Sequence, residues 1–198
     1  LKIALYKGFV KLNELGAQPK AIIFTESVRT QKYLYEELQK TNFKNKIVLF
    51  NGSNNDDKSK ELYHNWVNDK KHKEKVSGSR AVDIRAAIVD TFRDENHQLM
   101  IATEAAAEGI NLQFCSMVVN YDLPWNPQRI EQRIGRCHRY GQEHDVVVIS
   151  KTGKIGDIYL ISGVHIALPL LQDKPDKGEN KWKASEYPKE LSKIKSEA

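Results

Sequence analysis

Cysteine and long apolar runs are scarce in this chain. Its 198 residues include only two cysteines, Cys115 and Cys137, which is too few for a disulfide framework and lacks the paired spacing of a zinc site. Such usage is typical of a reducing compartment, so we expect a cytoplasmic protein. No apolar run approaches the roughly 20 residues that a membrane-spanning helix needs, and residues 1–15 lack the small-residue cleavage site of a signal peptide. We therefore expect no membrane partner.

The overall composition is that of a soluble α/β domain. Hydrophobic residues make up 40% of the chain, which is enough for a packed core, and its length allows one such domain with an appendage. The net charge of +5 leans towards a polyanionic partner, but only weakly, because many proteins without one are as basic.

Short apolar runs alternate with amphipathic segments along the chain. The runs predict buried strands, at residues 20–25, 46–50, 99–103, 116–121 and 145–149. The amphipathic segments predict helices, at residues 1–15, 27–38, 80–93 and 128–138. Residues 51–80 predict a helix followed by a mobile basic loop. This alternation predicts a parallel sheet covered on both faces. Residues 151–198 are expected to form a loosely docked or partly disordered appendage to a domain of residues 1–150.

Polar residues follow several of the predicted strands. Thr25, Thr103, Glu104 and Asp122 lie at strand carboxyl ends or directly after them, and the loop before residue 128 does too. Parallel sheets bind ligands beyond this edge, so we expect the candidate chemistry to gather there. The hydroxyls of Thr25 and Thr103, with nearby backbone N–H groups, are candidates to hold a backbone phosphate.

The segment from Arg129 to Gln142, RIEQRIGRCHRYGQ, contains the spacing Q-x-x-G-R-x-x-R. On a helix, Arg136 and Arg139 would share one turn, Gln132 would join them, and Gly135 would leave room for a close neighbour. Two such guanidinium groups are suited to bridging phosphate oxygens. The alternative is an ordinary solvated basic helix.

Three segments in order resemble motifs of a known family. AIIFTES (21–27) is similar to motif IV of the second RecA-like domain of superfamily 2 helicases and translocases. MIATEAAAEGINLQ (100–113) with VVNYDLPWNP (118–127) resembles motif V and its extension, and QRIGRCHRYGQ (132–142) resembles motif VI. The residues of these motifs resemble those of the Swi/Snf-type branch, and most of all the bacterial RapA-like group. Three motifs in this order are very specific.

The resemblance covers about residues 1–150 and implies an α/β, RecA-like three-layer fold with a parallel sheet flanked by helices. Two departures stand out. Ala106 and Ala107 occupy positions that are usually glycine in the Swi/Snf pattern, as in the bacterial group, and residues 53–80 form a longer, more polar connection than usual. The segment after Ser150 does not resemble the family's usual continuation.

The resemblance also implies roles for individual residues. Arg136 and Arg139 would reach the γ-phosphate of ATP across a domain cleft, with Arg139 as the main arginine finger and Gln132 orienting water or a phosphate oxygen. Residues that would couple the nucleotide edge to the nucleic-acid edge are Glu108, Gly109, Asn111 and Gly135. For Glu108 a solvated turn carboxylate, and for Asn111 a helix or turn cap, are the alternatives. Arg29 and Lys32 would add nonspecific attraction to phosphates, whereas Ser27 reads as a helix N-cap.

Motifs for binding the nucleotide itself are missing. The only Gly-Lys pair, Gly153-Lys154, has Ile155 after it and Val148 where a phosphate-binding loop needs its first glycine. Residues 94–97, Asp-Glu-Asn-His, mimic an acid box but end an amphipathic segment. We therefore expect ATP and Mg²⁺ to be held mainly by a first RecA-like lobe that this chain lacks, and the isolated chain to be inactive. We predict no metal site within the chain.

The expected partners are nucleic acid, most simply duplex DNA, the first RecA-like lobe of the same protein, and RNA polymerase or another DNA-bound complex, in association with the bacterial nucleoid. Two other readings remain open at this point. In the first, the protein is an RNA helicase or polymerase-recycling factor. In the second, it is a noncatalytic nucleic-acid-binding or regulatory module with a RecA-like fold.

Overall fold

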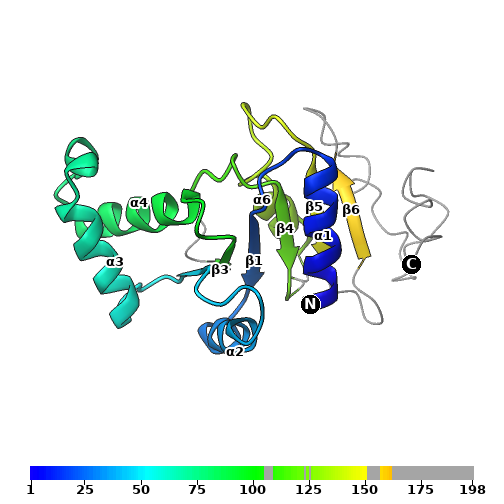
Figure 1. Cartoon of the computed structure of the whole chain (residues 1–198), viewed down its shortest axis with the longest axis horizontal. Helices are drawn as coiled ribbons and strands as arrows, with labels where there is room; N and C mark the ends of the chain where they lie inside the picture. The colour runs from blue at the N-terminus through cyan, green and yellow to red at the C-terminus, as the bar shows by residue number, and fades with distance from the viewer. Residues whose placement is uncertain (105–108, 123, 125, 151–156, 162–198) are drawn as a thin grey trace.

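The computed structural model describes residues 1–104, 109–122, 124, 126–150 and 157–161, and the described strands form one sheet (Figure 1). The sheet has six strands in the order β2-β3-β1-β4-β5-β6. The strands are β1 (Ala21–Thr25), β2 (Ile47–Phe50), β3 (Leu99–Thr103), β4 (Met117–Asn120), β5 (Val146–Ser150) and β6 (Asp157–Ile161). The first five pair with one another in parallel, as the sequence predicted.

β6 pairs antiparallel with β5 and forms the edge of the sheet. The sequence did not predict this strand, which lies in the segment assigned to the appendage. The division of the chain at residue 150 stays a prediction.

Helices connect the strands and close both faces of the sheet. They are α1 (Lys2–Glu14), α2 (Val28–Gln39), α3 (Asp57–Asn68), the 3₁₀ helix η1 (Lys70–Lys75), α4 (Arg80–Arg93) and α6 (Pro127–Ile134). Figure 1 shows α1 lying along β5, and α3 extending outward at the end of the molecule opposite β6.

The core lies on the two faces of the sheet, and β1 shows how the chain supplies both. Ile22 and Phe24 pack with side chains from α4 and α6, while Ala21 and Ile23 pack with side chains from α1 and α2. Successive side chains of a strand point to opposite faces, and all five residues of β1 are buried. A continuous apolar run is what a strand covered on both faces requires.

α6 is shorter than the sequence predicted. Asn126 caps it by accepting from the Gln128 N–H at 3.0 Å, but the helix ends at Ile134 and not at His138. Beyond it the chain turns, because the Arg136 carbonyl accepts from the Leu112 N–H at 2.9 Å and the Cys137 side chain is fully buried. The prediction that Arg136 and Arg139 share one helical turn was therefore wrong.

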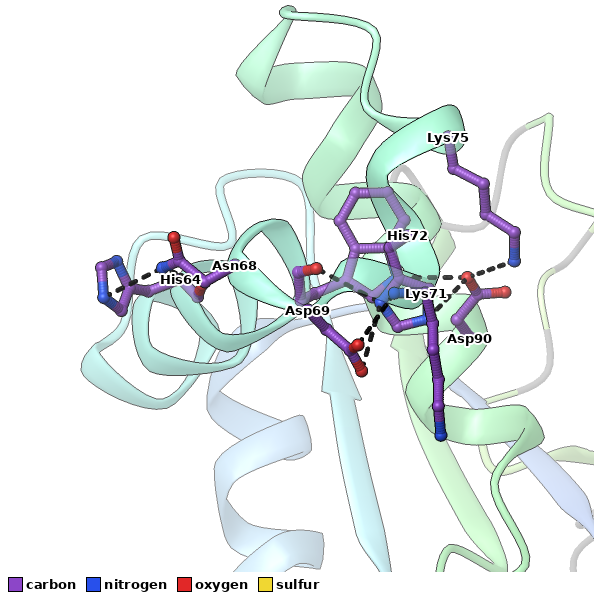
Figure 2. A network of polar contacts seen from close by, with 8 residues as sticks. His64, Asn68, Asp69, Lys71, His72, Lys75 and Asp90 are labelled. Atoms are coloured by element: carbon purple, nitrogen blue, oxygen red, sulfur yellow. Dashed lines mark hydrogen bonds and ion pairs between the residues drawn. The ribbon is translucent and has the colours of Figure 1, made fainter.

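Residues 70–75 form η1, where the sequence predicted a basic loop. Figure 2 shows Asp69, His72, Lys75 and Asp90 joined in one polar network beside α3. The Asp69 carboxylate accepts from the Lys71 N–H at 2.9 Å, and the His72 ring stacks on Trp66 with ring centroids 4.9 Å apart. These contacts give the basic segment a defined path.

Among the described residues, no helix is both long and apolar enough to span a bilayer.

Candidate functional site

α6 runs from the carboxyl ends of the strands, here called the carboxyl edge of the sheet, to their amino ends, here called the amino edge. Six residues separate it from the end of β4, at the carboxyl edge, and its eight residues span about 12 Å. The turn that follows it lies at the amino edge. There, the Gln142 amide donates to the carbonyls of Cys115 and Cys137 at 3.4 and 3.2 Å, and the Cys115 thiol donates to the carbonyl of Lys20, the residue before β1.

This course separates the candidate residues into two groups. Thr25, Thr103, Glu104 and Asp122 lie at the carboxyl edge, as expected. The arginine pair, which that expectation did not include, lies at the opposite end of α6. The physical reason is that a helix following a strand runs back across the sheet.

At the carboxyl edge, Thr25 and Thr103 face one another in register on neighbouring strands, and both are buried. The Thr25 hydroxyl donates to the Asp122 carboxylate at 2.7 Å, and the Glu26 N–H donates to the same oxygen at 3.0 Å. The Thr25 proton is therefore already used within the chain. A phosphate at this edge would meet the hydroxyl oxygens and backbone groups, and not a free Thr25 donor.

Arg29 and Lys32 are exposed on α2, which starts directly beyond the same edge. Ser27 caps this helix by accepting from the Thr30 N–H at 3.0 Å, so the cap interpretation of Ser27 is confirmed. The two cations therefore lie on the surface beside Thr25, where long-range attraction to phosphates is possible.

Arg133 is the principal residue at this edge that the sequence did not indicate. Its side chain is 2% exposed. It donates to Asn120 Oδ1 at 3.1 Å, to the Asp122 carbonyl at 2.8 Å and to Glu104 Oε2 at 3.1 Å. Its guanidinium also lies 5.3 Å from the centroid of the Phe24 ring. One signal was present, since Arg129 and Arg133 are four residues apart and thus on one helical face.

The arginine pair of the motif is presented differently. Arg139 is exposed and Arg136 is half-buried. Within the described part of the chain, neither guanidinium forms a hydrogen bond or an ion pair. Gln132 is also exposed, on the last turns of α6. Two permanent cations in one turn, without a partner among the described residues, are chemically suited to a polyphosphate.

The loop that precedes β4 contacts the arginine turn. Besides the Leu112–Arg136 backbone bond, the buried thiols of Cys115 and Cys137 are hydrogen-bonded to one another. That bond, together with burial, raises the pKa of the Cys137 thiol well above its ordinary value. Both side chains are fully buried, so they act as packed groups that join the loop to the turn.

Gly109 and Asn111 lie in the same loop, whereas Glu108 lies outside the described residues. Gly109 has φ of +78°, a backbone conformation that disfavours a side chain. Asn111 accepts from the Gln113 N–H at 3.2 Å, which is the turn-cap geometry considered as its alternative role. For Gly135, an added Cβ would meet carbonyl oxygens of α6 itself, the nearest at 3.2 Å, so within the described chain its only close neighbours belong to its own helix.

These residues fit the phosphates of ATP better than its metal. The exposed arginine turn supplies cations, whereas no group of three or more His, Cys, Asp or Glu side chains in the described ranges is placed to hold a metal ion. Asp94–His97 closes α4, with the Asp94 carboxylate accepting from the Asn96 N–H at 2.7 Å, which confirms it as a helix end.

The chain is similar in sequence to known bacterial proteins. It is 42% identical over 135 residues to the uncharacterized ATP-dependent helicase YqhH of Bacillus subtilis, covering 68% of this chain and 19% of that protein. It is 45% identical over 64 residues to the RNA polymerase-associated protein RapA of Cronobacter sakazakii, covering 32% of this chain and 7% of that protein. The chain thus spans about a fifth of YqhH.

Among solved structures, the C-terminal part of the Fun30 ATPase domain superposes with a TM-score of 0.52 at 20% identity, covering 77% of this chain and 40% of that one. This likeness supports the RecA-like fold. Residues 31–141 match the helicase conserved C-terminal domain. The motifs, the sheet and these matches agree, and the chain belongs to the helicase C-terminal domain family, as a Swi/Snf-type member of superfamily 2.

Proposed function

We propose that the chain is the second motor lobe of an ATP-dependent translocase that moves along nucleic acid, most simply duplex DNA. The observation that carries this proposal is the division of the candidate residues between two edges joined by α6. One edge holds buried threonines beside exposed cations, and the other presents Arg136 and Arg139 without partners in the described chain. A motor lobe needs one surface that binds the nucleic acid and another that faces the nucleotide.

Bound ATP with Mg²⁺ would supply the phosphoryl group whose transfer to water drives movement, and a first lobe would hold both. Arg139, as the more exposed of the pair, would stabilise negative charge that develops on the transferred group, with Arg136 beside it. Gln132 would orient the attacking water or a phosphate oxygen. Asn111 and Gly109 would connect this edge with the strand ends through the loop that contacts Arg136.

At the other edge, backbone phosphates would lie against the ends of β1 and β3, near Thr25 and Thr103. Arg29 and Lys32 would add nonspecific attraction. The relation to RapA proteins supports RNA polymerase, or another complex bound to DNA, as a further partner of the whole protein.

The test is ATP hydrolysis by the complete protein, with and without duplex DNA, for wild type and Arg139→Ala. We expect DNA-stimulated turnover that falls by roughly 10³-fold in the variant while ATP binding persists. Lys44→Ala, which removes an exposed cation far from α6, is the control and is expected to keep wild-type turnover. Unchanged turnover in Arg139→Ala would assign the finger to Arg136, and a parallel Arg136→Ala variant decides this.

A second candidate function is a noncatalytic nucleic-acid-binding or regulatory module with the same fold. A complete protein without a first RecA-like lobe would favour it. It predicts nucleic-acid binding without ATP turnover by the complete wild-type protein.

Comparing duplex DNA, single-stranded DNA and RNA as stimulators of ATP turnover separates a DNA translocase from an RNA helicase.

A further inference from the structure

Arg133 is a buried cation in α6 whose partners lie on other elements. The Glu104 carboxylate follows β3, Asn120 ends β4, and the Asp122 carbonyl lies in the turn after β4. Asn120 is held in turn by its own amide, which donates to the Ser150 hydroxyl of β5 at 3.3 Å. One side chain thus ties α6 to the carboxyl ends of two strands directly and a third indirectly.

The contact with Glu104 is the charged member of this set. Arg133 is 2% exposed and Glu104 is 23% exposed, and the two groups are 3.1 Å apart. A buried guanidinium left without its carboxylate is strongly unfavourable, so movement of Glu104 favours a matching movement of Arg133. By contrast, Arg129 reaches the same carboxylate oxygen at 3.3 Å but is 53% exposed, where water can replace the partner.

Glu104 and Asp122 also join this ion pair to the two threonines. Glu104 directly follows Thr103 in the chain. Asp122 accepts from Thr25 through its carboxylate and from Arg133 through its carbonyl. The polar groups at the strand ends and the inner face of α6 therefore form one connected network. At its far end α6 leads, after Gly135, directly into Arg136.

We propose that the Arg133–Glu104 ion pair is a positioning device that links occupancy of the strand-end edge to the placement of the Arg136–Arg139 turn. This inference rests on the proposed motor function. A phosphate taken up beside Thr103 shifts the backbone that carries Glu104. Arg133 follows its carboxylate, and α6 moves with it as a rigid eight-residue rod that carries the arginine turn. Arg133 itself touches neither nucleotide nor nucleic acid.

The test uses the complete protein with Glu104→Gln, Arg133→Lys and the double variant. Arg129→Ala is the matched control, because it removes the exposed partner of the same carboxylate from the same helix. Steady-state ATPase is measured with and without duplex DNA. Since coupling between two sites is commonly worth 5–150-fold, we expect each single variant to lower the stimulation factor about tenfold. The double variant should add little to either single change, and Arg129→Ala should keep the wild-type factor.

A merely structural role would give a different pattern. It would lower the thermal midpoint and reduce basal and stimulated turnover by the same factor, which leaves the ratio unchanged and overturns the inference. A second readout is the affinity for duplex DNA with and without a nonhydrolysable ATP analogue. Coupling is reciprocal, so the variants should lose the nucleotide dependence of DNA affinity while the affinity without nucleotide persists.

The wild-type arm separates the two proposals. Wild-type protein that shows no DNA-stimulated ATPase would refute the motor function, and with it this inference. Wild-type stimulation that survives intact in both Glu104→Gln and Arg133→Lys would refute the positioning role alone. Glu104→Gln keeps the shape and an acceptor oxygen, so it provides a folded variant if Arg133→Lys does not fold.

Discussion

Lys20 is a buried lysine directly before β1, and its ammonium group donates hydrogen bonds to three backbone carbonyls. It donates to the carbonyls of Phe92, Asp94 and His97 at 2.8, 2.8 and 2.7 Å. These carbonyls lie at and beyond the carboxyl end of α4, where the helix dipole favours a cation. Burial lowers the pKa of Lys20 because it removes the ammonium from water, and the contacts with α4 offset that cost.

We predict that Lys20→Met lowers the free energy of unfolding by about 3 kcal/mol, because three acceptors lose their donor together. Urea denaturation followed by circular dichroism measures the difference. Lys44→Met, at an exposed position, is the control and should change stability by less than about 0.5 kcal/mol. Equal effects of the two substitutions would show that the buried contacts contribute nothing.

Cys115 and Cys137 form the second residue-scale feature. Both are fully buried, and hydrogen bonding to Cys115 with burial raises the pKa of the Cys137 thiol. A disulfide reagent must reach the sulfur atom, and burial of both side chains prevents this in the folded chain. We therefore predict that Ellman's reagent at pH 8 labels neither cysteine in the folded chain and both in urea. Rapid labelling of either thiol without denaturant would contradict the burial of the pair.

At the scale of elements, α3, η1 and α4 are held together by Asp90. This carboxylate accepts from the Trp66 indole at 3.1 Å and from Lys75 at 2.7 Å, and His72 lies 3.9 Å away (Figure 2). Burial by itself would raise the pKa of Asp90, but the hydrogen bonds from Lys75 and Trp66 outweigh it and hold the pKa below its ordinary value. The ionised form therefore stabilises the fold.

We predict that Asp90→Asn lowers the free energy of unfolding by about 1 kcal/mol at pH 7, because Lys75 is largely exposed and water screens the pair. The folded pKa lies below the unfolded value. The contribution is therefore fully present above the unfolded pKa and is lost as pH falls through the folded one. Urea midpoints of wild type and variant should thus converge as the pH is lowered below about 4.

Glu74→Gln, at an exposed carboxylate of η1, is the matched control and should show no convergence of this kind. If the stability difference between wild type and Asp90→Asn grew at acidic pH, protonated Asp90 would stabilise the fold more than ionised Asp90. That result would contradict the lowered pKa of Asp90.

Elements were predictable where local sequence and burial agree. The apolar runs of β1, β3 and β5 are buried along their whole length, and Ser27 caps α2 as its position suggested. The end of α6 and the path of residues 70–75 were not predictable, because partners distant in sequence decide them. Leu112 takes the Arg136 carbonyl, and Asp90 receives Lys75.

At the scale of the whole molecule, the family and the parallel sheet could be predicted from three motifs in order, but the arrangement of the site could not. Spacing within RIEQRIGRCHRYGQ does not reveal that Arg133 points into the sheet edge while Arg136 and Arg139 lie at the other end. Exposed and buried arginines look alike in a sequence. Their separation follows only from the length and direction of α6.

The placement of Arg29 and Lys32 beyond the carboxyl edge leads to a prediction about salt. Each phosphate neutralised by a cation contributes about −0.9 to the slope of log affinity against log salt concentration. We predict that this chain binds duplex DNA with a negative slope, and that Arg29→Ala with Lys32→Ala makes the slope shallower by about 2. Fluorescence anisotropy between about 50 and 200 mM salt measures it.

The control removes the same net charge elsewhere. Lys7→Ala with Lys44→Ala replaces exposed cations on α1 and before β2, away from the strand ends, and should leave the slope unchanged. If both double variants changed the slope equally, the attraction would come from the net charge of +5 alone and not from a defined edge. A wild-type slope near zero would show that this chain neutralises no phosphates, and the DNA would then be bound elsewhere in the protein.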